Sequence, residues 1–169
     1  MEEKKLFKVV ITAIVVKDGR YFDDAQYRYL VLQRSPDEKK FPSRWTVPGG
    51  KLTTEDYTHL KKDTPDYWYN VLERTLRREV KEEAGIEITN IRYVTSLADA
   101  REGDDPSLVI SCLAQYASGD VRLDKSMVRH RWVALEEAKS IDLIEGIFEE
   151  IQIAEQVLNG GSAREWSKE

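Results

Sequence analysis

Three glutamates are crowded into the end of a predicted helix, in the segment RREVKEEAG at residues 77–85. Gly85 is the kind of residue that ends a helix in a left-handed cap. Glu79, Glu82 and Glu83 stand at i, i+3 and i+4, so they share one helical face. Like charges repel at this spacing, and carboxylates are disfavoured at the negative end of the helix dipole. This conflict predicts a bound divalent cation, because clustered carboxylates are hard oxygen ligands that suit Mg²⁺.

The helix that carries these glutamates is expected to run from about Pro65 to Ala84. Thr64 is a typical N-cap residue, and proline is favoured at the first helical position. Apolar residues follow at helical spacing and predict one buried stripe. Trp68, near the predicted start, is expected to attach the helix to the core.

The rest of the chain predicts an α+β fold with a mixed sheet and helices on both faces. A C-terminal helix is expected over 141–158, with Ser140 as its N-cap. Residues 1–169 form one predicted domain, in which 51–65 is an irregular loop and 160–169 a mobile tail. β-Branched and aromatic runs predict strands at 9–16, 27–33, 45–47, 86–91, 93–98, 108–116 and 130–134.

Composition excludes some classes of function. The net charge of −5 gives no electrostatic basis for binding a nucleic acid polymer. The single cysteine, Cys112, lies in an apolar run and is expected to be a buried structural thiol. The N-terminal apolar run at 9–16 is β-branched and lacks a cleavage signal, so we interpret it as a strand rather than a signal peptide. These features favour a cytoplasmic protein without a membrane span.

Two segments together carry a resemblance to a known family. WTVPGGKL at residues 45–52 and REVKEEAGI at 78–86 resemble the Nudix hydrolase motif, Gly-x5-Glu-x7-Arg-Glu-Ψ-x-Glu-Glu-x-Gly-Ψ, where Ψ is apolar. Gly50 matches the first glycine. The resemblance implies a Nudix-like α/β/α sandwich with a mixed β-sheet. The second half matches at every specified position, namely Arg78, Glu79, Val80, Glu82, Glu83, Gly85 and Ile86.

The two halves of the motif are out of register with each other. Counted forward from Gly50, the first motif glutamate falls at Asp56; counted back from Arg78, it falls at Asn70, 14 positions later. This difference predicts a loop inserted between the glycine turn and the helix. The first glutamate is missing from the helical register, and Glu73 could substitute because it lies four residues before Arg77.

The resemblance implies an enzyme that uses Mg²⁺, with Mn²⁺ as a substitute, to cleave a nucleoside diphosphate linked to another moiety. Substrates of this class include nucleotide sugars, ADP-ribose and nucleoside triphosphates. The implied partner is a small nucleotide rather than a nucleic acid polymer, and the family is compatible with a homodimer. By the same resemblance Arg78 orients a motif glutamate, and the metal ligands are Glu79, Glu82, Glu83 and the Gly50 carbonyl.

The remaining candidate residues are less fixed by the motif. The general base is expected among Glu83, Asp124 and Asp120, because the loop before Trp132 lacks the acid that is common in the family. Arg34, Lys51 and Gly49 are candidates for contacting phosphates, since two are cations and glycine lets the backbone approach closely. Tyr57 is a candidate for stacking on a nucleobase.

Two other functions compete with the enzyme. One is a Nudix-like module that binds or senses a nucleotide without turnover, which the altered first glutamate favours. The other is an interaction domain in which the acidic helix face is simply solvated. The intact glutamate trio favours the enzyme, because a pure binding module does not need to keep it.

Overall fold

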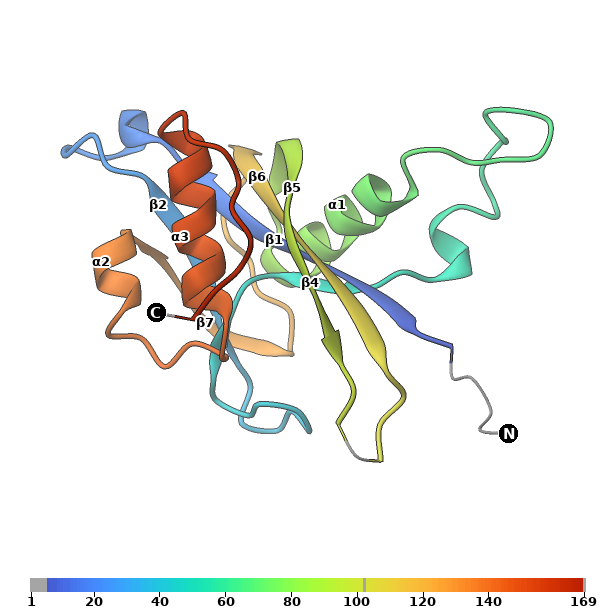
Figure 1. The fold of residues 1–169 in the computed structure, drawn as a ribbon, viewed down its shortest axis with the longest axis horizontal. Coiled ribbons are helices and arrows are strands. Elements are labelled where there is room, and N and C mark those ends of the chain that lie inside the picture. Colours follow the sequence, from blue (N-terminus) through green and yellow to red (C-terminus); the bar gives the residue numbers. More distant parts are fainter. Residues whose placement is uncertain (1–5, 102, 169) are drawn as a thin grey trace.

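The computed structural model describes residues 6–101 and 103–168 and contains one mixed β-sheet with helices on both faces (Figure 1). The main order of strands is β3-β2-β1-β6-β5, while β4 pairs with β1 and β7 pairs with β2. The elements are β1 (Lys8–Lys17), β2 (Arg28–Arg34), β3 (Trp45–Thr46), β4 (Gly49–Lys51), α1 (Val71–Ala84), β5 (Glu87–Asp99), β6 (Ser107–Ser118), β7 (Met127–Val133), α2 (Leu135–Ala138) and α3 (Ile147–Leu158). Short 3₁₀ turns cover Gly19–Tyr21 and Thr54–Asp56. The predicted α+β sandwich is confirmed.

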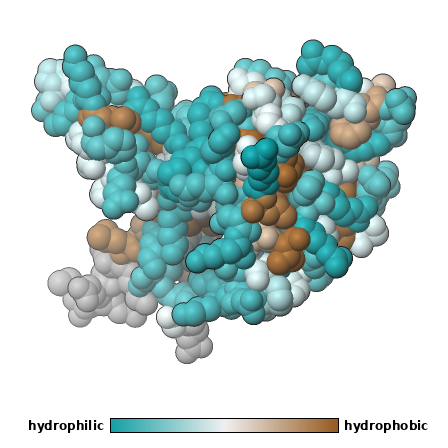
Figure 2. Space-filling view, turned by 180° about the vertical axis from the view of Figure 1, so that it is seen from behind, coloured by the Kyte–Doolittle hydropathy of each residue, from teal (hydrophilic) through white to brown (hydrophobic). Residues whose placement is uncertain are grey.

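The two faces of the sheet follow from alternation along β1. Ile14 and Val16 are buried in one apolar cluster with residues of α3, whereas Ala13 and Val15 are buried in a second cluster with residues of α1. Successive side chains of a strand point to opposite faces, so one buried strand serves both helices. Figure 2 shows the molecule from the side opposite to the view in Figure 1. This surface is mostly hydrophilic, and its apolar side chains lie in small groups.

β1 has different antiparallel neighbours at its two ends. It pairs with β2 only at Val16 and Lys17, whereas its earlier residues pair with β4 at Val10, Ile11 and Thr12. β6 runs parallel to it along most of its length. The short strand β4 therefore holds its glycines beside the middle of β1, next to α1.

The predicted start of the first helix is wrong. α1 begins at Val71, and Asn70 before it is left-handed at φ +55°. The Thr64 hydroxyl accepts a hydrogen bond from the Tyr67 amide, so it caps a loop turn instead of the helix. Trp68 also stays in this loop. Its indole N–H donates to the Leu60 carbonyl at 2.9 Å. The prediction that Trp68 attaches the first helix to the core is therefore wrong.

The predicted start of the C-terminal helix is also wrong, because α3 begins at Ile147. The preceding segment is extended beside β3. The Trp45 amide donates to the Asp142 carbonyl, and the Ile144 amide donates back to the Trp45 carbonyl. Ser140 bonds to the Glu137 carbonyl at the end of α2 and is not the N-cap. The strands predicted at 86–91 and 93–98 form one strand, β5, which pairs irregularly with β6.

The C-terminal segment runs back along α3 (Figure 1). The Trp166 indole N–H donates to the Gly146 carbonyl at 3.3 Å, and Lys168 lies 3.1 Å from Glu145. Mobility of 160–169 stays a prediction. Cys112 is buried, as predicted, and burial raises the pKa of its thiol to about 11.

Residues 1–5, 102 and 169, which the predicted domain 1–169 includes, lie outside the residues that the structure describes. In the described part of the chain, no helix combines the length and apolar character needed to cross a membrane.

Candidate functional site

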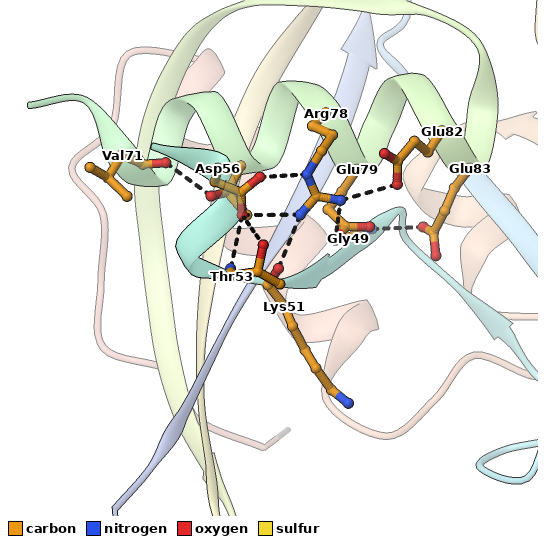
Figure 3. Close-up of polar contacts among 10 residues, drawn as sticks. Gly49, Lys51, Thr53, Asp56, Val71, Arg78, Glu79, Glu82 and Glu83 are labelled. Atoms are coloured by element: carbon orange, nitrogen blue, oxygen red, sulfur yellow. Dashed lines mark hydrogen bonds and ion pairs between the residues drawn. The ribbon is translucent and has the colours of Figure 1, made fainter. Parts of the chain in front are cut away.

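The three glutamates of α1 lie beside the two glycines of β4 (Figure 3). The Gly49 amide donates to Glu83 Oε2 at 2.9 Å. A Cβ on Gly50 would lie 2.2–2.3 Å from the carboxylate atoms of Glu79, which no real contact allows. The glycine pair therefore lets the carboxylate end of α1 approach the backbone of β4, while the predicted contact of these glycines with a metal ion or phosphate stays a prediction.

Arg78 connects this cluster to the turn that follows β4 (Figure 3). Its guanidinium lies 2.5 Å from Asp56, 2.9 Å from Glu79 and 3.0 Å from Glu82. It also donates to the Lys51 carbonyl at 3.1 Å. Arg78 thus contacts two of the predicted metal ligands, and its role in orienting them stays a prediction.

The acid that completes the motif is Asp56 rather than Glu73. Asp56 follows the register counted from Gly50 and binds Arg78 across 22 residues of sequence. Arg77, the partner considered for Glu73, donates to the Ile88 carbonyl. The segment 57–70, between the 3₁₀ turn and α1, has the 14 residues of the register difference, so we expect the insertion there rather than at 51–65.

Replacing Asp56 by Asn is expected to destabilise the fold by about 1–3 kcal/mol, because a nearly buried charged hydrogen-bond partner of Arg78 is lost. The hydrogen bond from Arg78 is the main cause that lowers the pKa of Asp56 to about 2. A depressed carboxyl pKa stabilises the fold above pH of about 4, and this contribution is lost as the pH falls through about 2. Urea unfolding of the wild type and variant measures the difference.

The exposed neighbour Glu55 offers the matched control. Glu55→Gln is expected to change the free energy of unfolding by less than about 0.5 kcal/mol. Equal stability of Asp56→Asn and wild type at pH 7 would contradict the assigned pairing.

Burial sets the electrostatics of two of the glutamates. It is the main cause that raises the pKa of Glu83 to about 8, and nearby Glu79 and Asp124 add to this, while the Gly49 amide and Arg34 oppose it. Burial also raises the pKa of Glu79, against the effect of Arg78. Ionising both carboxyls here is unfavourable unless further positive charge is present.

The residues present fit a hard divalent cation. Their donors are carboxylate and carbonyl oxygens, and two of the carboxyls are buried where a cation would favour their ionised form. Within residues 6–101 and 103–168, no three acidic, histidine or cysteine side chains already stand in a metal-binding arrangement. Glu82, whose side chain is 56% exposed, is turned toward Arg78.

The other predicted site residues have partners of their own or point away from this cluster. The Lys51 side chain points away from the carboxylates (Figure 3). Arg34 lines a cavity with Glu83 and is bonded to Glu38. Asp124 acts electrostatically on Glu83 but is bonded to Ser126. Asp120 is exposed and acts electrostatically on Lys17, not on the glutamates. Tyr57 packs on Trp68 in the inserted loop, with ring centroids 5.3 Å apart.

Two adjoining hollows open at the β4 glycines. One, of about 470 Å³, is lined by the glutamates, Arg78 and Asp56. The other, of about 590 Å³, shares Gly49, Gly50 and Glu83 and continues to α3. Glu150, which lines this second cavity, was not predicted from the sequence. It could have been found as the one glutamate at an inward-facing position among the apolar residues Ile147, Ile151 and Ala154 of α3.

Comparison with known proteins identifies the family. The family model for the NUDIX domain matches residues 12–151. The NAD-capped RNA hydrolase NudC of Enterobacter sp. (strain 638) is 43% identical over 63 residues. That stretch covers 36% of this chain and 23% of the relative, so the match spans less than a quarter of the curated protein.

Solved structures share the fold. The NUDIX domain of Shewanella oneidensis NrtR, in complex with ADP ribose, has a TM-score of 0.63 and 21% identity, and the match covers 93% of this chain and 90% of that one. A C. elegans Ap4A hydrolase has a TM-score of 0.63 and 21% identity, with 90% and 98% covered. Since the family model spans most of the sequence and the motif residues converge at β4, this chain belongs to the Nudix hydrolase family.

Proposed function

We propose that this protein is a divalent-metal-dependent pyrophosphohydrolase that cleaves a nucleoside diphosphate linked to another moiety. The observation that carries the proposal is the approach of Glu79 and Glu83 to Gly49 and Gly50, at the edge of a cavity of about 590 Å³. A cavity of this size fits a nucleoside-sized ligand. The relatives support the class, because those named above act on NAD-capped RNA or Ap4A, or bind ADP ribose.

Each residue of the site has a proposed role that follows from its position. Glu79, Glu82, Glu83 and the Gly50 carbonyl would hold Mg²⁺ or Mn²⁺. The bound ion supplies charge neutralisation of the diphosphate and an activated water.

Arg78 positions Glu79 and Glu82. Arg34 and Lys51 line the cavity and add positive charge for phosphates. Glu83 and Asp124 are the candidates to accept the proton of the attacking water, since both lie near the cluster.

A nucleotide-binding module without turnover is the second candidate. The observation that favours it is the turn of Glu82 toward Arg78 instead of toward the other two glutamates. A module of this kind would bind nucleotide and metal but release no nucleoside monophosphate. Homodimer formation stays a prediction for either function.

Metal removal and a substrate panel test the proposal. The panel is ADP-ribose, a nucleotide sugar, NAD, Ap4A, a nucleoside triphosphate and NAD-capped RNA, each incubated with Mg²⁺ and analysed by chromatography. At least one compound is expected to release nucleoside monophosphate or inorganic pyrophosphate, and EDTA is expected to reduce this to background until Mg²⁺ or Mn²⁺ is added back. Binding of nucleotide without turnover in both metals would favour the sensing module, and turnover of capped RNA alone would contradict a small-nucleotide substrate.

A further inference from the structure

Glu150 is a buried carboxyl on the inward face of α3. The residue is 4% exposed, and its Oε2 accepts a hydrogen bond of 2.7 Å from the Ser111 hydroxyl. The neighbouring inward residues Ile147, Ile151 and Ala154 belong to the apolar core. A carboxyl buried among apolar residues with one hydroxyl partner is costly to stability. The fold alone therefore does not explain why this position is glutamate.

The carboxyl retains unused hydrogen-bonding capacity. Among the described residues, the one hydrogen bond of the Glu150 carboxyl comes from Ser111, and Oε1 is not among the fully buried polar atoms that lack a partner, so it stays accessible from the cavity. Burial raises the pKa of the group, while the Ser111 hydroxyl lowers it. An oxygen that is accessible from the cavity can be satisfied by water, and a ligand that enters the cavity can take the place of that water as its hydrogen-bond partner.

The cavity connects Glu150 with the glutamate cluster. Val10 and Thr12 of β1 stand opposite Val109 and Ser111 of β6, on the face of the sheet that α3 covers. Of these four residues, Val10, Thr12 and Val109 line the cavity together with Glu150. Gly49, Gly50 and Glu83 line the same cavity, so one ligand bound in it can approach both acidic groups.

Charge and wall chemistry fix which end of a nucleotide faces Glu150. A diphosphate is repelled by this carboxyl and attracted at the other end, where the cation would sit. The walls also carry charged side chains such as Lys40, Asp99 and Arg101. Next to the apolar Val47, Ile144 and Ile147, however, a sugar would bury hydroxyls without partners. A flat heteroaromatic ring can pack its apolar faces against these side chains, and it can present an N–H donor at its edge.

We propose that Glu150 is a specificity-determining residue that accepts a hydrogen bond from the amino group of a nucleobase bound in this cavity. This inference rests on the proposed function, since it assigns the base end of the same substrate. Bases that present a carbonyl at the position of the amino group place an acceptor against the ionised carboxyl, and they are disfavoured because they must shift to offer their ring N–H instead. Adenine and cytosine belong to the accepted class, and hypoxanthine and uracil to the rejected one.

Binding measurements test the inference without needing turnover. Calorimetry with Mg²⁺ gives the Kd of ADP against IDP and of CDP against UDP, pairs in which an amino group is replaced by a carbonyl. In at least one pair, the wild type is expected to prefer the amino base by about 10- to 100-fold. Glu150→Met should bring this ratio to about 1, Glu150→Gln should leave part of it, and the neighbouring control Glu149→Gln should preserve it.

A stability measurement separates recognition from a structural role. Methionine removes the buried carboxyl at similar volume, so Glu150→Met is expected to keep or raise the thermal midpoint while it removes the preference. A lower midpoint with an unchanged ratio would overturn the inference, as would a wild type without preference or without saturable binding of all four diphosphates. Preference without hydrolysis of any panel substrate would instead refute the proposed function and leave the role of Glu150 standing.

Discussion

Glu83→Gln is expected to lower kcat by at least about 100-fold while the protein stays folded. The glutamine keeps an oxygen that can accept the Gly49 amide, so the contact between α1 and β4, 2.9 Å in the wild type, can persist. What is lost is the negative charge that a metal ion needs at this position. The measurement is kcat at saturating Mg²⁺, with circular dichroism and thermal unfolding to verify the fold.

The matched control is Glu87→Gln, which makes the same chemical change at the start of β5. Glu87 is half exposed and pairs with Lys81 at 2.8 Å, a surface pair that contributes about 0–1 kcal/mol. It is expected to retain wild-type kcat. If Glu83→Gln keeps full activity with the same dependence on Mg²⁺, Glu83 is neither a metal ligand nor the base.

The glutamate cluster was predictable because it depends on local geometry. Glu79, Glu82 and Glu83 share a face in any α-helix that spans them, and the conflict with the helix dipole is visible in the sequence. The strand character of the β-branched run in β1 and the apolar stripe of α1 are local in the same way, and both were confirmed. What periodicity does not give is the depth of burial, which separates Glu83 from the exposed Glu82.

The point at which the inserted loop ends and α1 begins was not predictable, because the contacts of the loop compete with local helix signals. Thr64 and Pro65 form a good helix start in isolation. In the structure the Tyr69 amide donates to Asp63, and the left-handed Asn70 redirects the chain into α1. The pairing of Asp56 with Arg78 likewise spans the loop, so no local window contains both residues.

The start of α3 shows the same competition between local pattern and tertiary pairing. Residues 141–146 continue the apolar spacing of the helix, but they hydrogen-bond to Trp45 of β3 instead. Gly146, at φ +93°, then turns the chain into α3. Glu150 lies on the inward, apolar side of this helix. A prediction from periodicity alone assigns this side to apolar residues and gives no reason for a glutamate there.

The adjacent glycines of β4 are expected to respond to alanine in opposite ways. At Gly49 a Cβ would lie 2.4 Å from the Ile11 carbonyl oxygen and 2.7 Å from the Thr12 Cα, both rigid backbone of β1. Gly49→Ala should therefore break the pairing of β4 with β1 and destabilise the fold by about 3 kcal/mol or more. At Gly50 the atoms in the way belong to the Glu79 carboxylate, the flexible end of a side chain.

Gly50→Ala is accordingly expected to stay folded and to lose function. Displacing the carboxylate of Glu79 costs little in stability, but it moves a proposed metal ligand away from the Gly50 carbonyl. The apparent affinity for Mg²⁺ should fall by about 10- to 100-fold, with a comparable loss of kcat at limiting metal. Titrating activity against Mg²⁺ measures this, while urea unfolding compares the two variants.

Because neither glycine has a positive φ, backbone strain does not contribute, and the contrast isolates the neighbour that each Cβ would meet. Equal loss of stability in both variants would show that Glu79 is packed rigidly, and unchanged Mg²⁺ dependence in Gly50→Ala would remove Glu79 from the metal site.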